Sequence, residues 1–223
     1  MIRIDKVEDN KDLRELVKTL EMEKEAKDNV LNMLDSGSDT LLSAAFVDNR
    51  LIALCSARFL EWDSDFFEQR SYQIEITSLN PLKLSGIHLS MLVESTLNAL
   101  IQKNAEFVSA RVDVRNGSYI RVLESHGFLT YDLTCIFAAR CDNLIKKNRE
   151  YPPGFVIRGS SEEDLWSLIA LSANAFSYDR FHEDPGFGKE RADAMHGIWV
   201  RNLHYSDISK LVVAELKGNI VGY

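Results

Sequence analysis

Hydrophobic positions in the first 140 residues follow two periods, one typical of strands and one typical of helices. In several short runs apolar residues alternate with polar ones, and Asp48-Asn49 between two such runs predicts a hairpin. From His88 to Asn104, apolar residues recur every three or four positions, which predicts an amphipathic helix. The predicted strands are residues 2–5, 41–46, 51–59, 72–79, 107–114 and 133–139, and shorter helices are predicted around residues 13–20, 30–34 and 119–123.

This pattern breaks between residues 142 and 154, which read DNLIKKNREYPPG. Pro152-Pro153 excludes a helix or a central strand there, because proline lacks the backbone donor and fixes φ. We therefore predict one domain at residues 1–141, a linker at residues 142–154 and a second domain at residues 155–223.

The pattern of the first domain starts again after this linker. Ile157 corresponds to Ile4, and residues 210–223 align without a gap with residues 41–54, which predicts a second hairpin. The chain ends inside the second strand of that hairpin. We expect residues 155–223 to be the N-terminal half of a second, truncated copy, and the chain to be an inactive form of an enzyme. The open strand edge favours pairing with another chain, so a homodimer is expected.

Composition and charge restrict the class of protein. With 223 residues, 45% of them hydrophobic, and a net charge of -8, the chain resembles soluble globular proteins and is a poor partner for nucleic acid or an anionic membrane. No apolar run reaches the roughly 18 residues of a membrane span. Cys55, Cys135 and Cys141 are an odd number without metal-ligand spacing, which favours reduced thiols in a cytoplasmic protein.

Residues 116–128 read NGSYIRVLESHGF, an Asn that begins a helix ending in a Gly-Phe turn. Together with the order of predicted elements, this segment resembles the GNAT superfamily of acyl-CoA-dependent N-acyltransferases. The resemblance covers residues 1–140 as a whole unit and residues 155–223 as the first half of another. It implies an α/β (α+β) fold with a mixed central sheet flanked by helices, and acetyl-CoA as the co-substrate of an N-acetyltransferase.

Two further runs, residues 62–67 (WDSDFF) and residues 175–182 (AFSYDRFH), resemble the dTDP-fucosamine acetyltransferase group of that superfamily. This resemblance implies acetyl transfer to the amino group of a small molecule, with a nucleotide-linked amino sugar as the candidate acceptor. From its residues alone, the first run is either a sugar-binding corner or a bulged strand whose aromatic residues fill a core, and we favour the bulged strand.

The second run opens a loop rich in aromatic and charged residues. Two interpretations stay open. The loop is either a lid over the acceptor, with an arginine for a phosphate or carboxylate and aromatic rings for stacking, or a segment whose aromatic residues seat it on the core. His182 and Asp184 have no evident third ligand nearby, so no metal site is predicted. The candidate substrate-binding residues are Tyr178, Arg180, Phe181, His182 and Asp184.

The cofactor loop departs from the superfamily pattern. In the superfamily, backbone donors and a helix N-terminus hold the CoA pyrophosphate, but here Leu84 and Ser85 stand where Arg-Gly is usual. Leu123 stands where a proton-donating Tyr is frequent, and leucine cannot donate a proton. The first domain is therefore expected not to catalyse, no catalytic residue is assigned, and the alternative function is a non-catalytic GNAT-like binding or scaffold module. The degenerate candidates for cofactor contacts are Leu79, Gly86, Ile87 and Asn116.

Overall fold

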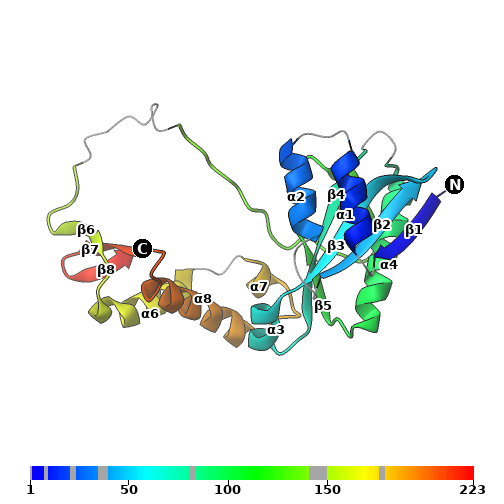
Figure 1. The fold of residues 1–223 in the computed structure, drawn as a ribbon. Helices are drawn as coiled ribbons and strands as arrows, with labels where there is room; N and C mark the ends of the chain where they lie inside the picture. Colours follow the sequence, from blue (N-terminus) through cyan, green and yellow to red (C-terminus); the bar gives the residue numbers. More distant parts are fainter. Residues whose placement is uncertain are drawn as a thin grey trace. The chain divides into compact units, whose positions relative to one another are not determined.

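The computed structural model describes residues 2–7, 10–20, 24–34, 40–80, 84–140, 150–175 and 179–223. The chain divides into two compact units, Met1–Leu129 and Thr130–Tyr223 (Figure 1). Most of the linker predicted at residues 142–154 lies outside the described residues. Among the described helices, none is both long and apolar enough to cross a membrane.

The first unit is built on a five-stranded sheet in the order β1-β2-β3-β4-β5. Neighbouring strands are antiparallel up to β4, whereas β4 and β5 are parallel. The predicted mixed sheet is therefore confirmed. Its strands are β1 (Ile2–Val7), β2 (Thr40–Val47), β3 (Arg50–Phe59), β4 (Ser71–Ser78) and β5 (Phe107–Ala110).

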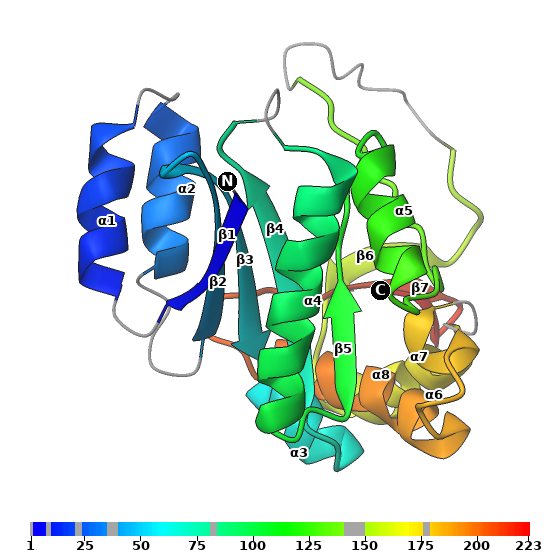
Figure 2. The same cartoon turned by 90° about the vertical axis from the view of Figure 1, so that its right-hand side faces the viewer.

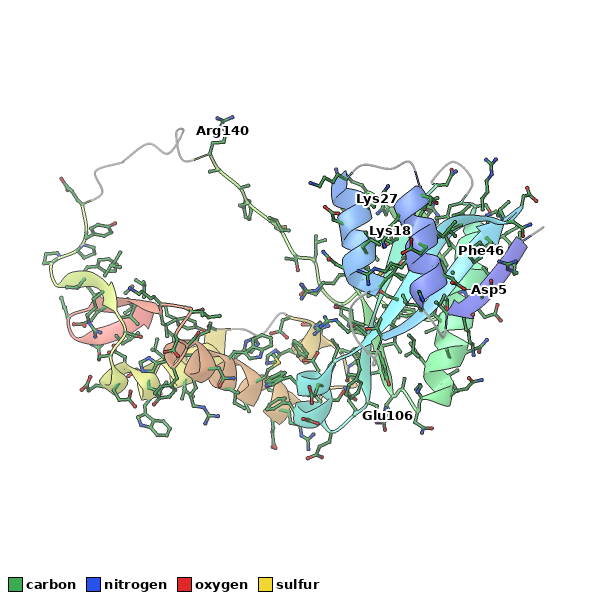
Figure 3. The ribbon with its side chains drawn as sticks, viewed as in Figure 1. Asp5, Lys18, Lys27, Phe46, Glu106 and Arg140 are labelled. Atoms are coloured by element: carbon green, nitrogen blue, oxygen red, sulfur yellow. The ribbon has the colours of Figure 1, made fainter. Side chains whose placement is uncertain are left out.

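Helices cover both faces of this sheet, as predicted (Figure 2). On one face, α1 (Asn10–Thr19) and α2 (Lys24–Leu34) bury Val17 and Val30 against β2 and β3. The Lys27 ammonium group of α2 donates to the Lys18 carbonyl of α1 (Figure 3). On the other face, α4 (Gly86–Gln102) and α5 (Gly117–Ser125) close a second apolar cluster with the sheet.

The second unit contains an antiparallel sheet in the order β6-β7-β8. Leu168 and Val200 of two helices pack on Val213 of this sheet and form its core. The helices approach closely at Gly197, where an added Cβ would lie 3.0 Å from the Ile169 Cγ2 atom. The elements are β6 (Phe155–Gly159), a 3-10 turn η2 (Glu162–Asp164), α6 (Leu165–Ala175), α7 (Arg180–Glu183), α8 (Lys189–His204), β7 (Val212–Leu216) and β8 (Asn219–Gly222).

The hairpins of the two units share turn geometry and pairing register. Both turn residues have positive φ in each hairpin, 48° and 60° at Asp48-Asn49 and 50° and 81° at Lys217-Gly218. A bulge follows Ala45 in β2 and the aligned position, Ala214, in β7. The preceding strand also has one register, because Ile4 faces Ala45 and Ile157 faces Ala214. The ungapped alignment of residues 41–54 with residues 210–223 therefore predicts the correct partners.

Three predicted elements are wrong. The strand predicted at residues 107–114 ends at Ala110, because β5 stops pairing with β4 at Ile74 although β4 continues to Ser78. Residues 133–139 form no strand, and Ile136 and Phe137 are 90% and 94% exposed. Residues 62–67 belong to a helix, α3 (Glu61–Phe67), and not to a bulged strand. Its Trp62 and Phe66 rings stack with centroids 5.0 Å apart, as helical i,i+4 spacing allows.

One arginine of β6 forms hydrogen bonds both to β7 and to the turn before α6. Arg158 of β6 donates from both Nη atoms to the Asp164 carboxylate and from Nε to Glu215 of β7. Asp164 also accepts from Ser161 N and thereby caps the turn that leads into α6. Hydrogen bonds from Arg158 hold the pKa of Asp164 far below its ordinary value. The sheet and the first helix thus share one ion-pair network.

We predict that Asp164→Asn destabilises the second unit by about 2 kcal/mol, because hydrogen bonds to charged groups typically contribute about 1.5–3 kcal/mol. A depressed pKa stabilises the fold above the unfolded value and loses that contribution as the pH falls through the folded value. Urea unfolding should therefore show wild-type stability falling below about pH 4, a fall that is smaller in Asp164→Asn. Asp207→Asn, which changes an exposed aspartate of the same unit, is the control and should behave as wild type.

The described cysteines should differ in reactivity. Burial raises the pKa of the Cys55 thiol to about 12, whereas Cys135 lies exposed beside Ile136 and Phe137. Because the thiolate is the nucleophile, iodoacetamide at pH 8 should modify Cys135 rapidly and Cys55 only after unfolding. Peptide mass spectrometry measures both rates. Slow modification of native Cys135 would mean that residues 133–139 pair as a strand after all.

Candidate functional site

The only parallel strand pair among the described residues, β4 with β5, is closed at one end by a cluster of hydrogen bonds. The Arg70 carbonyl accepts from Glu106 N, and the Glu106 carboxylate accepts from Arg70 N at 2.8 Å. Arg70 Nε also donates to the carbonyl of Lys103, just after α4. Figure 3 labels Glu106 at this end of β5. These contacts fix where the two strands begin.

The other end of the strand pair is open. Pairing starts at Ser71 with Phe107 and stops at Ile74 with Ala110, although β4 continues to Ser78. Backbone groups of alternate residues point to the same edge of a strand. Since the Arg70 carbonyl faces β5, the N–H and C=O groups of Ile76 and Ser78 face the gap that β5 leaves. A ligand that lies along β4 can therefore bind backbone donors and acceptors there.

A cavity of about 100 Å³ lies at this gap, between the strands and α5. Its wall combines strand backbone, apolar side chains and one phenol. Ser78 adjoins it on β4, and the Ser78 Oγ atom is buried without a well-formed hydrogen bond among the described residues. The lining residues are Ile74, Glu75, Ile76, Ala110, Arg111, Val112, Asp113, Asn116, Tyr119 and Leu123.

Three residues at the start and along one face of α5 line this cavity: Asn116, Tyr119 and Leu123. Asn116 occupies the N-cap position, but its side chain makes no capping hydrogen bond; the Asn116 carbonyl accepts from Tyr119 N instead. Leu123 is buried at the position where the superfamily often has its Tyr. Tyr119 lies one turn earlier on the same face, and burial raises its pKa, which the neighbouring Ser78 hydroxyl partly offsets. The cavity thus contains a protonated phenol that the sequence analysis did not single out.

The charged residues at the cavity are already paired in part. Arg115 Nη2 lies 2.6 Å from an oxygen of Asp113, and hydrogen bonds from Arg115 lower the pKa of Asp113 to about 2. Asp113 is therefore ionised at neutral pH and is a weak base. Glu75 and Arg111 are the other charged residues of the lining.

Of the four predicted cofactor contacts, the structure places Asn116 at the cavity and the others elsewhere. The Leu79 amide donates to the Ile52 carbonyl at 2.8 Å, so this donor is used within the sheet. Gly86 and Ile87 form the first turn of α4, where Ser85 is the N-cap and pairs reciprocally with His88. This capping box occupies two backbone donors, those of Ser85 and His88, that a phosphate could otherwise use.

The predicted substrate loop is a short helix in the second unit, and Tyr178 lies outside the described residues. Phe181 is buried and packs edge-on against Phe187 and Trp199. The Arg180 guanidinium lies over the Phe181 ring, 4.3 Å from its centroid. For Phe181 the structure favours the core interpretation over the lid interpretation.

Asp184 and His182 have different hydrogen-bond partners. The Asp184 carboxylate accepts from Gly186 N in the turn that follows α7. His182 Nδ1 lies 2.9 Å from the Asp179 carboxylate and His182 Nε2 lies 3.0 Å from the Asp193 carboxylate. His196 Nε2 contacts the second Asp179 oxygen at 2.6 Å. Two buried imidazoles thus converge on one carboxylate.

This cluster was missed in the sequence, although a signal for it exists. Residues 179–182 (DRFH) and 193–196 (DAMH) both have the form Asp-x-x-His, a spacing that places the two side chains on one helical face. The second copy lies within α8. No local rule indicates that the two copies meet.

Comparison with known proteins adds the following. No protein-family model matches the chain. The chain is 19% identical over 162 residues to the spore coat polysaccharide biosynthesis protein SpsD of Bacillus subtilis (strain 168), over 73% of this chain and 54% of that protein. It therefore spans about half the length of this curated relative.

Among solved structures, the chain is similar to a transcriptional regulator from Bacillus halodurans C-125 (13% identity, TM-score 0.45, 62% of this chain and 100% of that one). It is also similar to a GNAT-family acetyltransferase from Streptococcus pneumoniae (16%, 0.43, 58% and 85%). A third similar structure is the aminoglycoside N-acetyltransferase AAC(6')-Iy with CoA (16%, 0.46, 63% and 96%).

We predict that His182 makes the second unit more stable at acidic than at alkaline pH. Burial opposes the His182 charge, but hydrogen bonds from the ring to Asp179 and Asp193 outweigh it and raise the pKa above 6.5. A raised pKa stabilises the fold fully below the unfolded value and stops doing so as the pH rises through the folded value.

The measurement is urea unfolding in metal-free buffer at several pH values from about 6 upward. Wild type should lose stability over this range, and His182→Gln should lose less. Asn202→Gln, which changes an exposed residue of α8 that does not titrate, is the control and should keep the wild-type slope. A flat wild-type profile would contradict the prediction.

Proposed function

We propose that this chain is part of an N-acetyltransferase that transfers an acetyl group from acetyl-CoA to the amino group of a small molecule. The observation that carries the proposal is the gap beyond Ile74 and Ala110, with its cavity against α5. In the reaction, the amine attacks the thioester carbonyl, negative charge develops on its oxygen, and the thiolate leaves. Backbone donors at a fixed position are suited to stabilise that charge.

The first unit is proposed to hold the acyl-CoA arm along β4. A thin, largely apolar chain with amide groups matches a cavity of about 100 Å³ whose edge carries the backbone groups of Ile76 and Ser78. Buried backbone polar groups need partners, so a ligand that supplies amides there gains hydrogen bonds as well as apolar contact. Asn116 and Tyr119 lie at the same wall and are available for polar contacts.

The second unit is proposed to be a partial second copy of the first. The shared register at Ala45 and Ala214, together with the shared turn geometry, supports this proposal. All strand pairs in its described residues are antiparallel, so the second unit has no gap like that between β4 and β5. With Leu123 at the cavity wall of the first unit, we propose that the chain by itself does not transfer acetyl groups.

For the acceptor we propose a nucleotide-linked amino sugar. The sequence resemblance to amino-sugar acetyltransferases and the weak similarity to a polysaccharide biosynthesis protein both support this class. Arg180 is the residue proposed to meet an anionic part of the acceptor, because a guanidinium binds phosphate with paired donors. We also retain the proposal of a cytoplasmic protein that forms a homodimer, for which light scattering is the direct measurement.

The test is calorimetric titration of the full chain with acetyl-CoA. We expect binding, weakened about tenfold or more in Ala110→Leu because the added side chain fills the cavity. Ala138→Leu, which places the same change at an exposed position, is the matched control and should bind as wild type. Absence of acetyl-CoA binding by wild type, or equal weakening in both variants, would overturn the proposal for the first unit.

A non-catalytic binding or scaffold module is the second candidate, favoured by Leu123 in place of a proton donor. Acetyl-CoA binding without transfer to a dTDP-linked amino sugar supports a module that has kept its ligand. Binding of neither compound supports a scaffold. Acetyl transfer by the purified chain would contradict both the module and the proposed inactivity.

A further inference from the structure

We propose that Asp179, His182 and His196 bind a divalent transition-metal ion, and that Asp193 orients His182 for this task. The site lies entirely within the second unit and uses residues of α7, its N-cap and α8. Two imidazoles and one carboxylate are ligands typical of zinc, which makes Zn²⁺ the expected ion.

The donor atoms already converge. One ligand atom from each of the three residues lies within 4.8 Å of the others, the only such group among the described residues. Zinc bonds of about 2.0–2.2 Å place tetrahedral donors about 3.3–3.5 Å apart. The Asp179 carboxylate is 2.9 Å from His182 Nδ1 and 2.6 Å from His196 Nε2. To reach these separations, the Asp179 oxygens have to move away from the two ring nitrogens by less than about 1 Å.

The second ring nitrogen of His182 has the partner that a metal-bound histidine needs. His182 Nε2 lies 3.0 Å from the Asp193 carboxylate, which in turn lies 3.6 Å from Lys189 Nζ. A carboxylate at one imidazole nitrogen fixes the tautomer and orients the other nitrogen toward the metal. The ring positions are further set by packing, because His182 and His196 stack with an interplanar angle of 8° and His196 meets the Trp199 ring edge-on.

The three ligand side chains are not equally buried, which suits a metal site with one open coordination position. The side chains of His182 and His196 are 6% and 8% exposed, whereas that of Asp179 is 21% exposed. Three protein ligands leave one position of a tetrahedral ion for water or for an oxygen of a bound molecule. Metal binding requires the two ring nitrogens that face Asp179 to carry no proton.

The competing explanation is a network held by protons alone. Asp179 also accepts from Phe181 N and His182 N as the N-cap of α7, so the same carboxylate has a structural task without a metal. In that network His182 donates from both ring nitrogens. The two explanations differ in whether a metal replaces the protons between the rings and Asp179.

The experiment uses the full chain, freed of metal with EDTA and then titrated with CoCl₂ and, separately, with ZnCl₂. We expect one ion per chain, a visible d–d absorption band for tetrahedral cobalt, and a dissociation constant on the order of 1 μM for zinc. His196→Gln should abolish the cobalt band. Asp193→Asn should weaken zinc binding about 10–100-fold while the band keeps its shape, because it removes the orienting group and no ligand.

His204→Gln is the matched control, since His204 also belongs to α8 and also lies beside a carboxylate, that of Glu162. It should bind both ions as wild type does. Circular dichroism shows whether His196→Gln has folded, and the wild-type titration stands independently of that variant. Absence of the cobalt band in wild type, or equal weakening by Asp193→Asn and His204→Gln, would overturn the proposal.

Discussion

The end of strand pairing at Ile74 and Ala110 is the constraint on which the first unit's cavity depends. Arg70 and Glu106 fix the two strands at their start, and β3 keeps β4 straight to Ser78 by pairing with its other edge. Beyond Ala110 the chain after β5 therefore separates from β4, and α5 covers the space that this separation creates. At this cavity the strand backbone provides hydrogen-bond donors and acceptors, and the side chains add to them. A change of side chain at Leu123 would therefore leave the strand gap itself in place.

The two hairpins have the same turn geometry although their turn residues differ. Asp48-Asn49 and Lys217-Gly218 share no residue, yet both turns adopt positive φ, which Asn, Asp and Gly accept more readily than other residues. The twist of such a turn matches that of the strands it joins, and the bulge then falls at aligned positions. In the second unit, the segment between α6 and the hairpin contains α7 and α8, and these two helices form the Asp-His cluster.

Prediction from sequence succeeded where the signal is local. The hairpins and the helix near residues 88–104 follow from turn residues and periodicity within the segment itself. It failed at residues 133–139, because a mostly apolar run forms a strand only if another strand pairs with it, and pairing is not local. The Asp-His cluster was missed for a similar reason. Asp179 and His196 are 17 positions apart, and only the packing of α7 on α8 brings them together.

The first candidate site therefore depends on backbone pairing, and the second depends on the identity of its side chains. The cavity at β4 exists because a backbone pairing stops, so many sequences can build it, and a motif such as residues 116–128 indicates the fold more reliably than the activity. The cluster in the second unit exists because four side chains meet, and a change in any of them alters its chemistry directly. Buried histidines beside two carboxylates need either protons or a metal to balance that charge. The identity of that balancing charge decides whether this cluster has a structural role alone or brings chemistry of its own.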